Sequence, residues 1–295
     1  MNTIKNIIYG YIIGDSYGLG ILNNEKTNDF IELQDNKELN IEKGNYSFMS
    51  VFMLSIIDSM SKNKSVDTVD ILNKMCTSLI VGKYTSDGKV YNLDNNILNI
   101  LKHYINKNNL NIEYDEYDMK SDALCSVLPV ILFNYYKNDN LDNLVNVVNI
   151  TNNNELVLLG AYIYYKYIFN ILDGYDKYKA LYKVDIPDGF NKDIILKYKN
   201  ILKGNIYYKE IKHDNNIINV LSIVFYVILN SDNFKDIFMM LNNIDGNTNI
   251  YGALICSVAG LIYGIDDIDK SIISDIKNKK EINKYIRSFE RMLNK

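Results

Sequence analysis

Three polar residues open the most unusual run of the sequence. Asn247, Thr248 and Asn249 follow Gly246 and precede the apolar stretch "ALICSVAGLIYG" at 253–264, which is rich in small residues. The pattern predicts a helix that packs close to its neighbours and carries the polar side chains in its first turn. The N–H groups of such a turn favour a phosphate or another anion. Two aspartates in place of the asparagines would favour a metal ion, whereas amides lack the charge that Mg²⁺ needs.

A second polar pair lies inside an apolar run near the start of the chain. The stretch "YIIGDSYGLG" places Asp15 and Ser16 between Gly14 and Gly18. Glycine within a helix costs about 1 kcal/mol relative to alanine, so the close approach of another helix or of a ligand would explain it. A buried Asp15 needs hydrogen-bond partners. Those partners are either a neighbouring backbone at a helix crossing or a ligand.

Hydroxyl and amide side chains also stand at two other helix starts. Ser47 and Ser50 lie three residues apart in "GNYSFMSVFMLSIIDSM" and fall on one face of a predicted helix. Ser47 precedes that helix, where its hydroxyl is expected to cap the first turn. Thr151 and Asn152, with Glu155 close behind, form another capping arrangement.

The elements that must position these side chains are helices. Apolar residues at three- and four-residue spacing recur along the whole chain, and alternation with period two is nearly absent. Ser65 and the run 231–233 are expected helix caps, and Pro129 predicts a kink or a helix start. Segments 23–45 and 106–120 are polar and irregular, which indicates surface loops. The sequence therefore predicts an all-α fold in one compact domain, because no linker divides it.

Composition excludes some classes of partner. The net charge of −4 and a pI near 5.3 come without a basic stripe, so nucleic acid is not an expected partner. The longest apolar run, at 220–229, is too short to cross a bilayer, and the N-terminus lacks a signal-peptide cleavage site. Cys76, Cys125 and Cys256 have no short-spaced pair, which predicts reduced, buried thiols. We therefore expect a cytoplasmic protein without membrane partners.

In their order and spacing, these motifs resemble those of the ADP-ribosylglycohydrolase family, which includes dinitrogenase-reductase-activating glycohydrolase. The family's early Gly-Asp-Ala-x-Gly helix is matched by residues 14–18, and its aromatic residue with Thr-Asp-Asp-Thr by residues 46–50. A segment like Asn-Gly-Ala-x-x-Arg-x-x-Pro aligns with "SDALCSVLP" at 121–129, and a Thr-His pair with 151–152. The last motif, Gly-Asp-x-Asp-Thr before a Gly/Ala-rich helix, aligns with 246–250.

The resemblance covers about residues 4–268, leaves 269–295 as terminal helices and implies one all-α, orthogonal multi-helix domain over 1–295. Family enzymes hold two Mg²⁺ ions on carboxylates of the early and late motifs and, in many members, on a Glu after the first motif. The aligned positions here hold Leu22, Phe48, Met49, Asn247 and Asn249. None brings negative charge, a thioether is a poor donor for Mg²⁺, and two uncompensated ions repel each other. We therefore expect no metal and no cofactor.

Three functional interpretations follow. In the first, the chain is a pseudoenzyme that has lost the metal site and the hydrolase activity, and binds ADP-ribose, a related nucleotide or a protein partner. The polar side chains left to hold a ligand are Asp15, Ser47, Ser50, Asn247, Thr248 and Asn249.

In the second interpretation, the chain is an active ADP-ribosyl hydrolase with Mg²⁺ and a rebuilt site. That site would use Asp15, Asp245 or a loop carboxylate such as Asp115 or Glu116. His103 and His213, the two histidines of the sequence, are expected at surface or capping positions instead. In the third, the fold is an interaction module whose Tyr-rich stretch "AYIYYKYIF" marks an interface.

Overall fold

The computed structural model describes residues 3–107, 109, 115–137 and 140–294. Over these residues the chain forms α-helices and short 3₁₀-helices, with isolated β-bridges at Asn36–Ile41 and Ser47–Tyr91 in place of strands. The predicted all-α class is confirmed. Within the same residues, no helix is both long and apolar enough to cross a bilayer.

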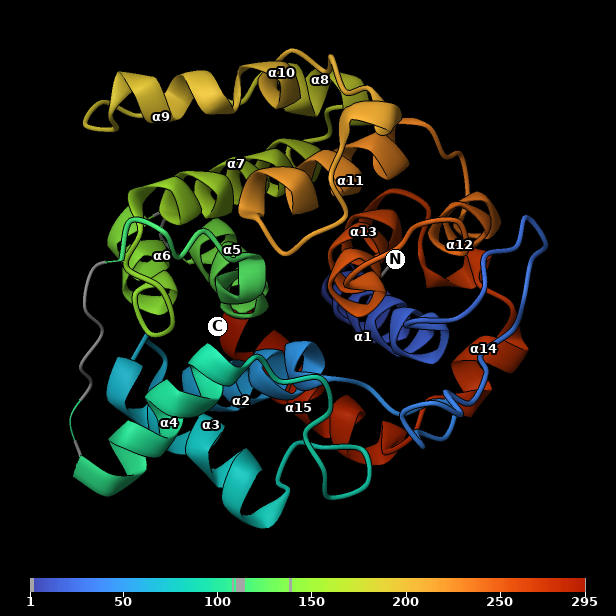
Figure 1. Ribbon diagram of the computed structural model, residues 1–295. Coiled ribbons are helices and arrows are strands. Elements are labelled where there is room, and N and C mark those ends of the chain that lie inside the picture. Colours follow the sequence, from blue (N-terminus) through green and yellow to red (C-terminus); the bar gives the residue numbers. More distant parts are fainter. Residues whose placement is uncertain (1–2, 108, 110–114, 138–139, 295) are drawn as a thin grey trace. The chain divides into compact units, whose positions relative to one another are not determined.

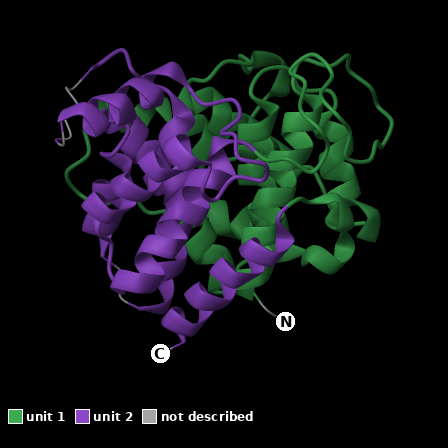
Figure 2. Ribbon diagram, turned by 90° about the horizontal axis from the view of Figure 1, so that it is seen from below, with its two compact units in different colours: residues 1–46, 166–277 green, residues 47–165, 278–295 purple. Residues whose placement is uncertain are grey.

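The helices fall into two compact units, and each unit combines two separate stretches of the chain (Figure 2). Unit 1 consists of residues 1–46 and 166–277, and unit 2 of residues 47–165 and 278–295. Each unit is described by itself. The single domain expected over 1–295 stays a prediction.

Unit 1 is organised around α13 (Thr248–Ile262), in which residues 248–260 are all buried. This helix packs against α1 (Thr3–Ile21), α11 (Ile217–Leu229) and α12 (Phe234–Leu241). The other helical elements of unit 1 are the second part of α7 (Glu155–Leu172), α8 (Lys177–Tyr182), α9 (Lys192–Lys197), α10 (Lys199–Leu202), η2 (Tyr208–Glu210), η3 (Ile265–Asp267) and α14 (Lys270–Asp275).

The helices α1 and α13 run antiparallel, side by side (Figure 1), and they approach more closely than side chains allow. A β-carbon added at Gly18 would lie 2.1 Å from the carbonyl oxygen of Thr248, and one at Gly14 would lie 2.0 Å from that of Gly252. Gly10 continues this row one turn earlier, with a carbonyl oxygen at 2.1 Å. Only glycine fits such an approach. The close contact that the glycines of the first motif predict is therefore present, and α13 makes it.

Unit 2 is organised around α2 (Phe48–Asn63), in which residues 48–60 are all buried. The other helical elements of unit 2 are α3 (Thr68–Val81), α4 (Asn95–Lys107), η1 (Ser121–Ser126), α5 (Val127–Tyr136), α6 (Leu141–Val148), the first part of α7 and α15 (Lys279–Leu293). α2 packs against α3, α5, η1 and α15. Pro129 is the third residue of α5, where its missing N–H leaves no intrahelical bond unmade, as expected for a helix start.

Helix caps differ in part from those expected. Ser47 caps α2, as predicted, by accepting a hydrogen bond from the N–H of Met49 at 3.2 Å. Asp67 rather than Ser65 caps α3. Asn154 rather than Thr151 or Asn152 stands before α7 and accepts from the N–H of Leu156 at 2.9 Å. Where several capping residues follow one another, the residue adjacent to the first buried turn takes the role.

The predicted loop at 23–45 contains no helix and closes one end of α1. Asn36 is fully buried within it and donates from its side-chain amide to the carbonyl oxygens of Leu19 and Leu22, at 3.0 and 2.8 Å. It thereby satisfies carbonyl groups that a helix C-terminus leaves without partners. The second predicted loop begins later than expected, because α4 extends to Lys107, and residues 108 and 110–114 lie outside the described residues.

Candidate functional site

The first group of candidate residues in unit 1 lies at the start of α13. Asn247 precedes the helix, is half-buried, and makes no capping hydrogen bond with its side chain. The hydroxyl of Thr248 donates to the carbonyl oxygen of Gly18 at 2.6 Å. Asn249 is fully buried in the same turn. The Thr248 hydroxyl therefore connects the first turn of α13 to the end of α1. Because it donates its proton to this carbonyl group, it can only accept a hydrogen bond from a ligand.

Asp15 lies on α1, the helix that packs closely against α13. Its neighbour Gly14 contacts the backbone of Gly252 on α13. The side chain of Asp15 is completely buried, and that of Ser16 is almost so. A carboxyl group in this position must be hydrogen-bonded or neutral, because an ionised carboxylate loses much of its hydration energy on burial. Unit 1 thus holds Asp15, Thr248 and Asn249 on one tightly packed helix pair, and we name these residues, with Asn247, the α13 cluster.

Asp245 has surroundings of a different kind. Its side chain is 59% exposed and pairs with Lys26, with 2.5 Å between Nζ and Oδ2. Its backbone N–H donates to Nδ1 of His213 at 3.3 Å. Gly246, which follows it, has a φ of +90° and leaves only 2.7 Å between an added β-carbon and the His213 carbonyl oxygen. His213 therefore supports the turn before α13, and Asp245 faces solvent and a lysine.

The second group, Ser47 and Ser50 in the first turn of α2, belongs to unit 2 and is named the α2 cluster. Both serines are fully buried, and Ser47 is engaged as the cap. Between them, Phe48 and Met49 are also fully buried. The ring of Phe48 packs edge-on against Phe52, with 5.9 Å between ring centroids. The side chains between the two serines therefore belong to the core of unit 2.

The loop carboxylates of unit 2 form local turns. Asp115 accepts from the N–H of Tyr117 at 2.8 Å through its side chain, and its carbonyl oxygen accepts from the side chain of Asn154 at 2.9 Å. Asn152 donates to the carbonyl oxygen of Asp118 at 3.1 Å. These asparagines hold the loop against the start of α7. The sequence offers no means of separating such bridging asparagines from the many others in the chain.

The residues at the expected metal positions do not suit Mg²⁺. Phe48 offers no donor atom, Met49 offers a thioether, and Asn247 and Asn249 offer uncharged amides. Mg²⁺ requires oxygen ligands and usually carboxylate charge. Over the described part of the chain, no group of three or more His, Cys, Asp or Glu side chains is placed to hold a metal ion. The mismatch rests on the chemistry of the donor atoms, and the absence of a metal stays a prediction.

Comparison with known proteins identifies the fold. Residues 1–295 match the family described as ADP-ribosylglycohydrolase. A solved structure described as "ADP-ribosylglycohydrolase-related protein complex" superposes with a TM-score of 0.77 at 15% sequence identity, over 99% of this chain and 98% of that chain. At this identity the likeness concerns the fold alone. No curated protein matches the sequence.

Proposed function

The chain belongs to the ADP-ribosylglycohydrolase family, and we propose that it is a member that has lost the two-metal site and the hydrolase activity. It retains a binding site for ADP-ribose or a related nucleotide, with a protein partner as the other possible occupant. The observation that carries this proposal is the complete burial of Phe48 and Met49 at the positions aligned with the early metal-binding aspartates. Apolar side chains packed into a core neither coordinate a cation nor activate a water molecule.

The ligand-binding part of the proposal is supported by what the first turn of α13 retains. A helix N-terminus attracts anions through its N–H groups without a metal ion. Asn247 is half-buried there and has a side chain that makes no capping bond, so its amide is available to a ligand. ADP-ribose carries both a diphosphate and sugar hydroxyls, which amides and hydroxyls bind well.

The alternative is an active hydrolase with a rebuilt site, for which Asp15 is the stronger candidate. Asp15 is buried beside α13, and burial of a carboxyl group is the usual means of making it a general acid or base. Asp245 is exposed and paired with Lys26, so it lacks the buried position that Asp15 has. This alternative predicts turnover that disappears in Asp15→Ala.

Two measurements on the full chain test the proposal. Titration calorimetry with ADP-ribose should give the same affinity with Mg²⁺ and with a chelator, and Asn247→Ala should weaken binding whereas Asn106→Ala, an exposed change on α4, should not. Release of ADP-ribose from a modified serine peptide should not exceed that of boiled protein. Affinity that rises strongly with Mg²⁺, or release that Asp15→Ala abolishes, would replace the proposal by the active-enzyme alternative.

A further inference from the structure

A positively charged segment of unit 1 has no part in the site described above. Residues 177–212, which include α8, α9, α10 and η2, contain nine lysines and four carboxylates. Their formal charge is therefore +5 in a chain whose net charge is −4. Lysine is abundant throughout this sequence, but a general excess would raise the lysine content of every segment alike. Here lysine is concentrated and the carboxylates are not, so the positive charge is a local property.

Most of these lysines have no acidic neighbour. Among the described residues, Lys177 is the one lysine of the segment within 4.0 Å of a carboxylate, that of Asp232 at 3.1 Å. The other eight are exposed. Lys179 and Lys183 lie over the ring of Tyr175, with 5.7 and 5.1 Å from Nζ to the ring centroid. We name this segment, residues 177–212, the lysine surface, and its charge is not neutralised within the unit.

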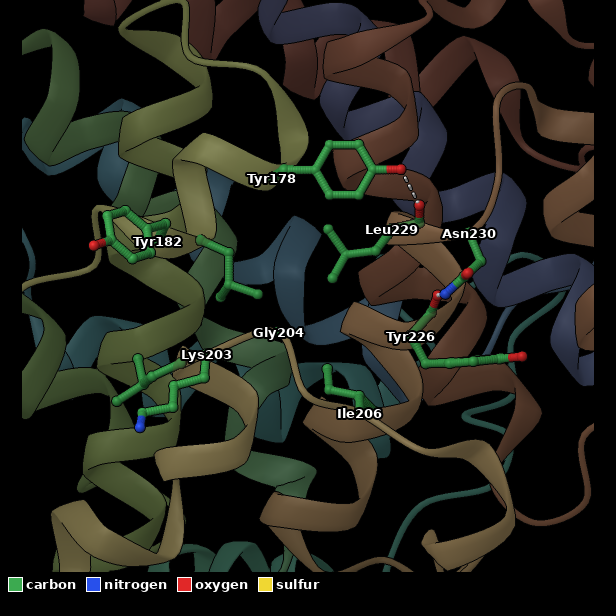
Figure 3. Close-up of a pocket in the computed structure, with 10 residues that line it drawn as sticks. Tyr178, Tyr182, Lys203, Gly204, Ile206, Tyr226, Leu229 and Asn230 are labelled. Atoms are coloured by element: carbon green, nitrogen blue, oxygen red, sulfur yellow. Dashed lines mark hydrogen bonds between the residues drawn. The ribbon is translucent and has the colours of Figure 1, made fainter.

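The lysine surface supplies part of the lining of a cavity of about 490 Å³ (Figure 3). Lys203 lines this cavity, and Lys179 and Lys183 directly follow the lining residues Tyr178 and Tyr182 in sequence. Leu181, Leu202, Ile206 and Leu229 supply an aliphatic lining, and Tyr182 and Lys203 lie on one side of the opening. This volume lies within the range of roughly 300–1,000 Å³ that is typical of binding pockets. Tyr182 is 83% exposed, so its ring is accessible to another molecule.

The walls of the cavity favour an apolar group over an anion. Helices α8, α10 and α11 all end at this cavity, at Tyr182, Leu202 and Leu229. Helix C-termini carry partial negative charge, which opposes a phosphate inside the cavity. Two of the three tyrosines that line the cavity are also poorly placed as stacking platforms. Tyr178 is fixed by a hydrogen bond from its hydroxyl to the Leu229 carbonyl oxygen at 2.8 Å, and Tyr226 is already stacked on Tyr208.

We infer that the lysine surface is a docking site for an acidic peptide segment of a partner protein, with one leucine- or phenylalanine-sized side chain inserted into the cavity. The apolar anchor fills a preformed pocket, which is how a few residues come to dominate an interface. Carboxylates on either side of the anchor meet the unpaired lysines outside the cavity, where complementary charge speeds association and fixes orientation. A polynucleotide is disfavoured, because successive bases need several free aromatic faces and the cavity offers only that of Tyr182 among its lining residues. The inference is independent of whether the family site turns over substrate.

Peptide display on the full chain tests this inference. Two random libraries are compared, one enriched in Asp and Glu and one in Lys and Arg. The acidic library should yield binders that share one Leu, Phe or Met among carboxylates, and the basic library should yield none. The affinity of a selected acidic peptide, labelled with fluorescein, is then measured by anisotropy, and it should fall as salt screens the charges.

Matched variants distinguish the contribution of the cavity to peptide binding from that of the lysine charges. Lys183→Glu with Lys203→Glu should weaken binding of the selected peptide by at least about tenfold, because Lys203 lines the cavity and Lys183 follows the lining residue Tyr182. Ile206→Trp, which fills the cavity, should weaken it by a similar factor. Lys102→Glu with Lys107→Glu reverses two exposed lysines of α4 and should leave it unchanged. Circular dichroism confirms that each variant is folded.

Several outcomes would overturn the inference. These are an acidic library that yields no binder, peptide binding that persists in Ile206→Trp, and equal losses in the α4 control. Tighter binding of oligothymidylate or of phosphatidylserine vesicles than of any selected peptide would also overturn it and would assign the lysine surface to a nucleic acid or to a membrane.

Discussion

Replacing Gly14 by alanine tests the close contact between α1 and α13, because the contact decides whether the substitution raises or lowers the free energy of unfolding. We call this contact, which is made through Gly10, Gly14 and Gly18, the seam. Alanine in an unhindered helix position stabilises a protein by about 1 kcal/mol relative to glycine. At Gly14, the new β-carbon would lie 2.0 Å from the carbonyl oxygen of Gly252, whereas ordinary contact begins at 3.4 Å. To reach ordinary contact, the two backbones must therefore separate locally by about 1.4 Å. The nearest atoms are the backbone of Gly252 and the β-carbon of Cys256, so no side-chain rotation can relieve the clash.

The expected cost follows from these opposing effects. Overpacking of a well-packed core costs about 1–3 kcal/mol and occasionally more. Because the clash at Gly14 is mainly with backbone, we take the upper end of this range, about 3 kcal/mol. After the gain of about 1 kcal/mol in helix propensity, we expect Gly14→Ala to lower the free energy of unfolding by about 2 kcal/mol. The melting temperature should fall by roughly 5 °C. Denaturant unfolding followed by circular dichroism measures the change. Ser16→Ala on the same helix is the control, because it adds no atoms and removes a buried hydroxyl that has no hydrogen-bond partner within the described structure. A Gly14→Ala protein at least as stable as the wild type would show that the helices do not meet at this residue.

Three further predictions concern unit 2 and the thiols. Ser47→Ala should cost about 1 kcal/mol of stability through loss of the α2 cap, measured by denaturant unfolding. Ser65→Ala should change little, because Asp67 rather than Ser65 caps α3 and the exposed Ser65 hydroxyl makes only a long hydrogen bond, 3.4 Å, to the carbonyl oxygen of Asn63. Burial raises the pKa of Asp58, but hydrogen bonds from Tyr84 and Lys62 and the charges of Lys62 and Lys74 outweigh burial and hold the pKa below its usual value. Stability from a depressed carboxyl pKa is present above the unfolded-state value, near pH 4, and is lost as the pH falls through the folded-state value. Asp58→Asn should therefore be less stable than the wild type at pH 7, and the gap should narrow below about pH 4; a gap that widens in acid would contradict the assignment. Burial raises the pKa of Cys76 to about 11 and those of Cys125 and Cys256 further. At pH 8 a water-soluble disulfide reagent should therefore label the three thiols only after denaturation. Rapid labelling of the folded protein would refute their burial.

The sequence predicts the helices well because each buried face leaves a periodic pattern. Residues 248–260 of α13 are buried on every side, as the small-residue run indicates. The periodic pattern of apolar residues does not show which other helix packs against a buried helix face. Gly14 and Gly18 predict a close neighbour, but their contact with α13 joins residues more than two hundred positions apart, and periodicity carries no information on pairing at that separation.

The candidate site is less predictable for a different reason. Capping and hydrogen-bonding side chains are abundant in this sequence, and only geometry shows which of them are already engaged. Ser47 and Thr248 satisfy backbone groups of their own unit. Asp245 directly follows the buried residue Ile244 in sequence, yet its side chain is exposed to solvent and pairs with Lys26. The lysine surface was missed because its charge is spread over several short helices, whereas a basic stripe is recognised in sequence by consecutive or periodic lysines.

Packing and metal binding depend on different atoms, so the fold can persist after the loss of the metal site that we propose. The seam of α1 and α13 depends on the missing β-carbons at Gly10, Gly14 and Gly18, since any side chain there would separate the backbones. A two-metal site depends on the oxygen atoms of side chains that project from the first turns of two helices. Under the proposed function, Phe48 and Met49 replace carboxylates and thereby remove those oxygens. Because both side chains are buried, the replacement is expected to stabilise α2 through the burial of apolar surface. Selection for stability alone would therefore keep the glycines and would not restore the carboxylates. A family member that no longer needs the metal site is expected to have the pattern found here, with the glycine row intact and the acidic positions apolar or amide.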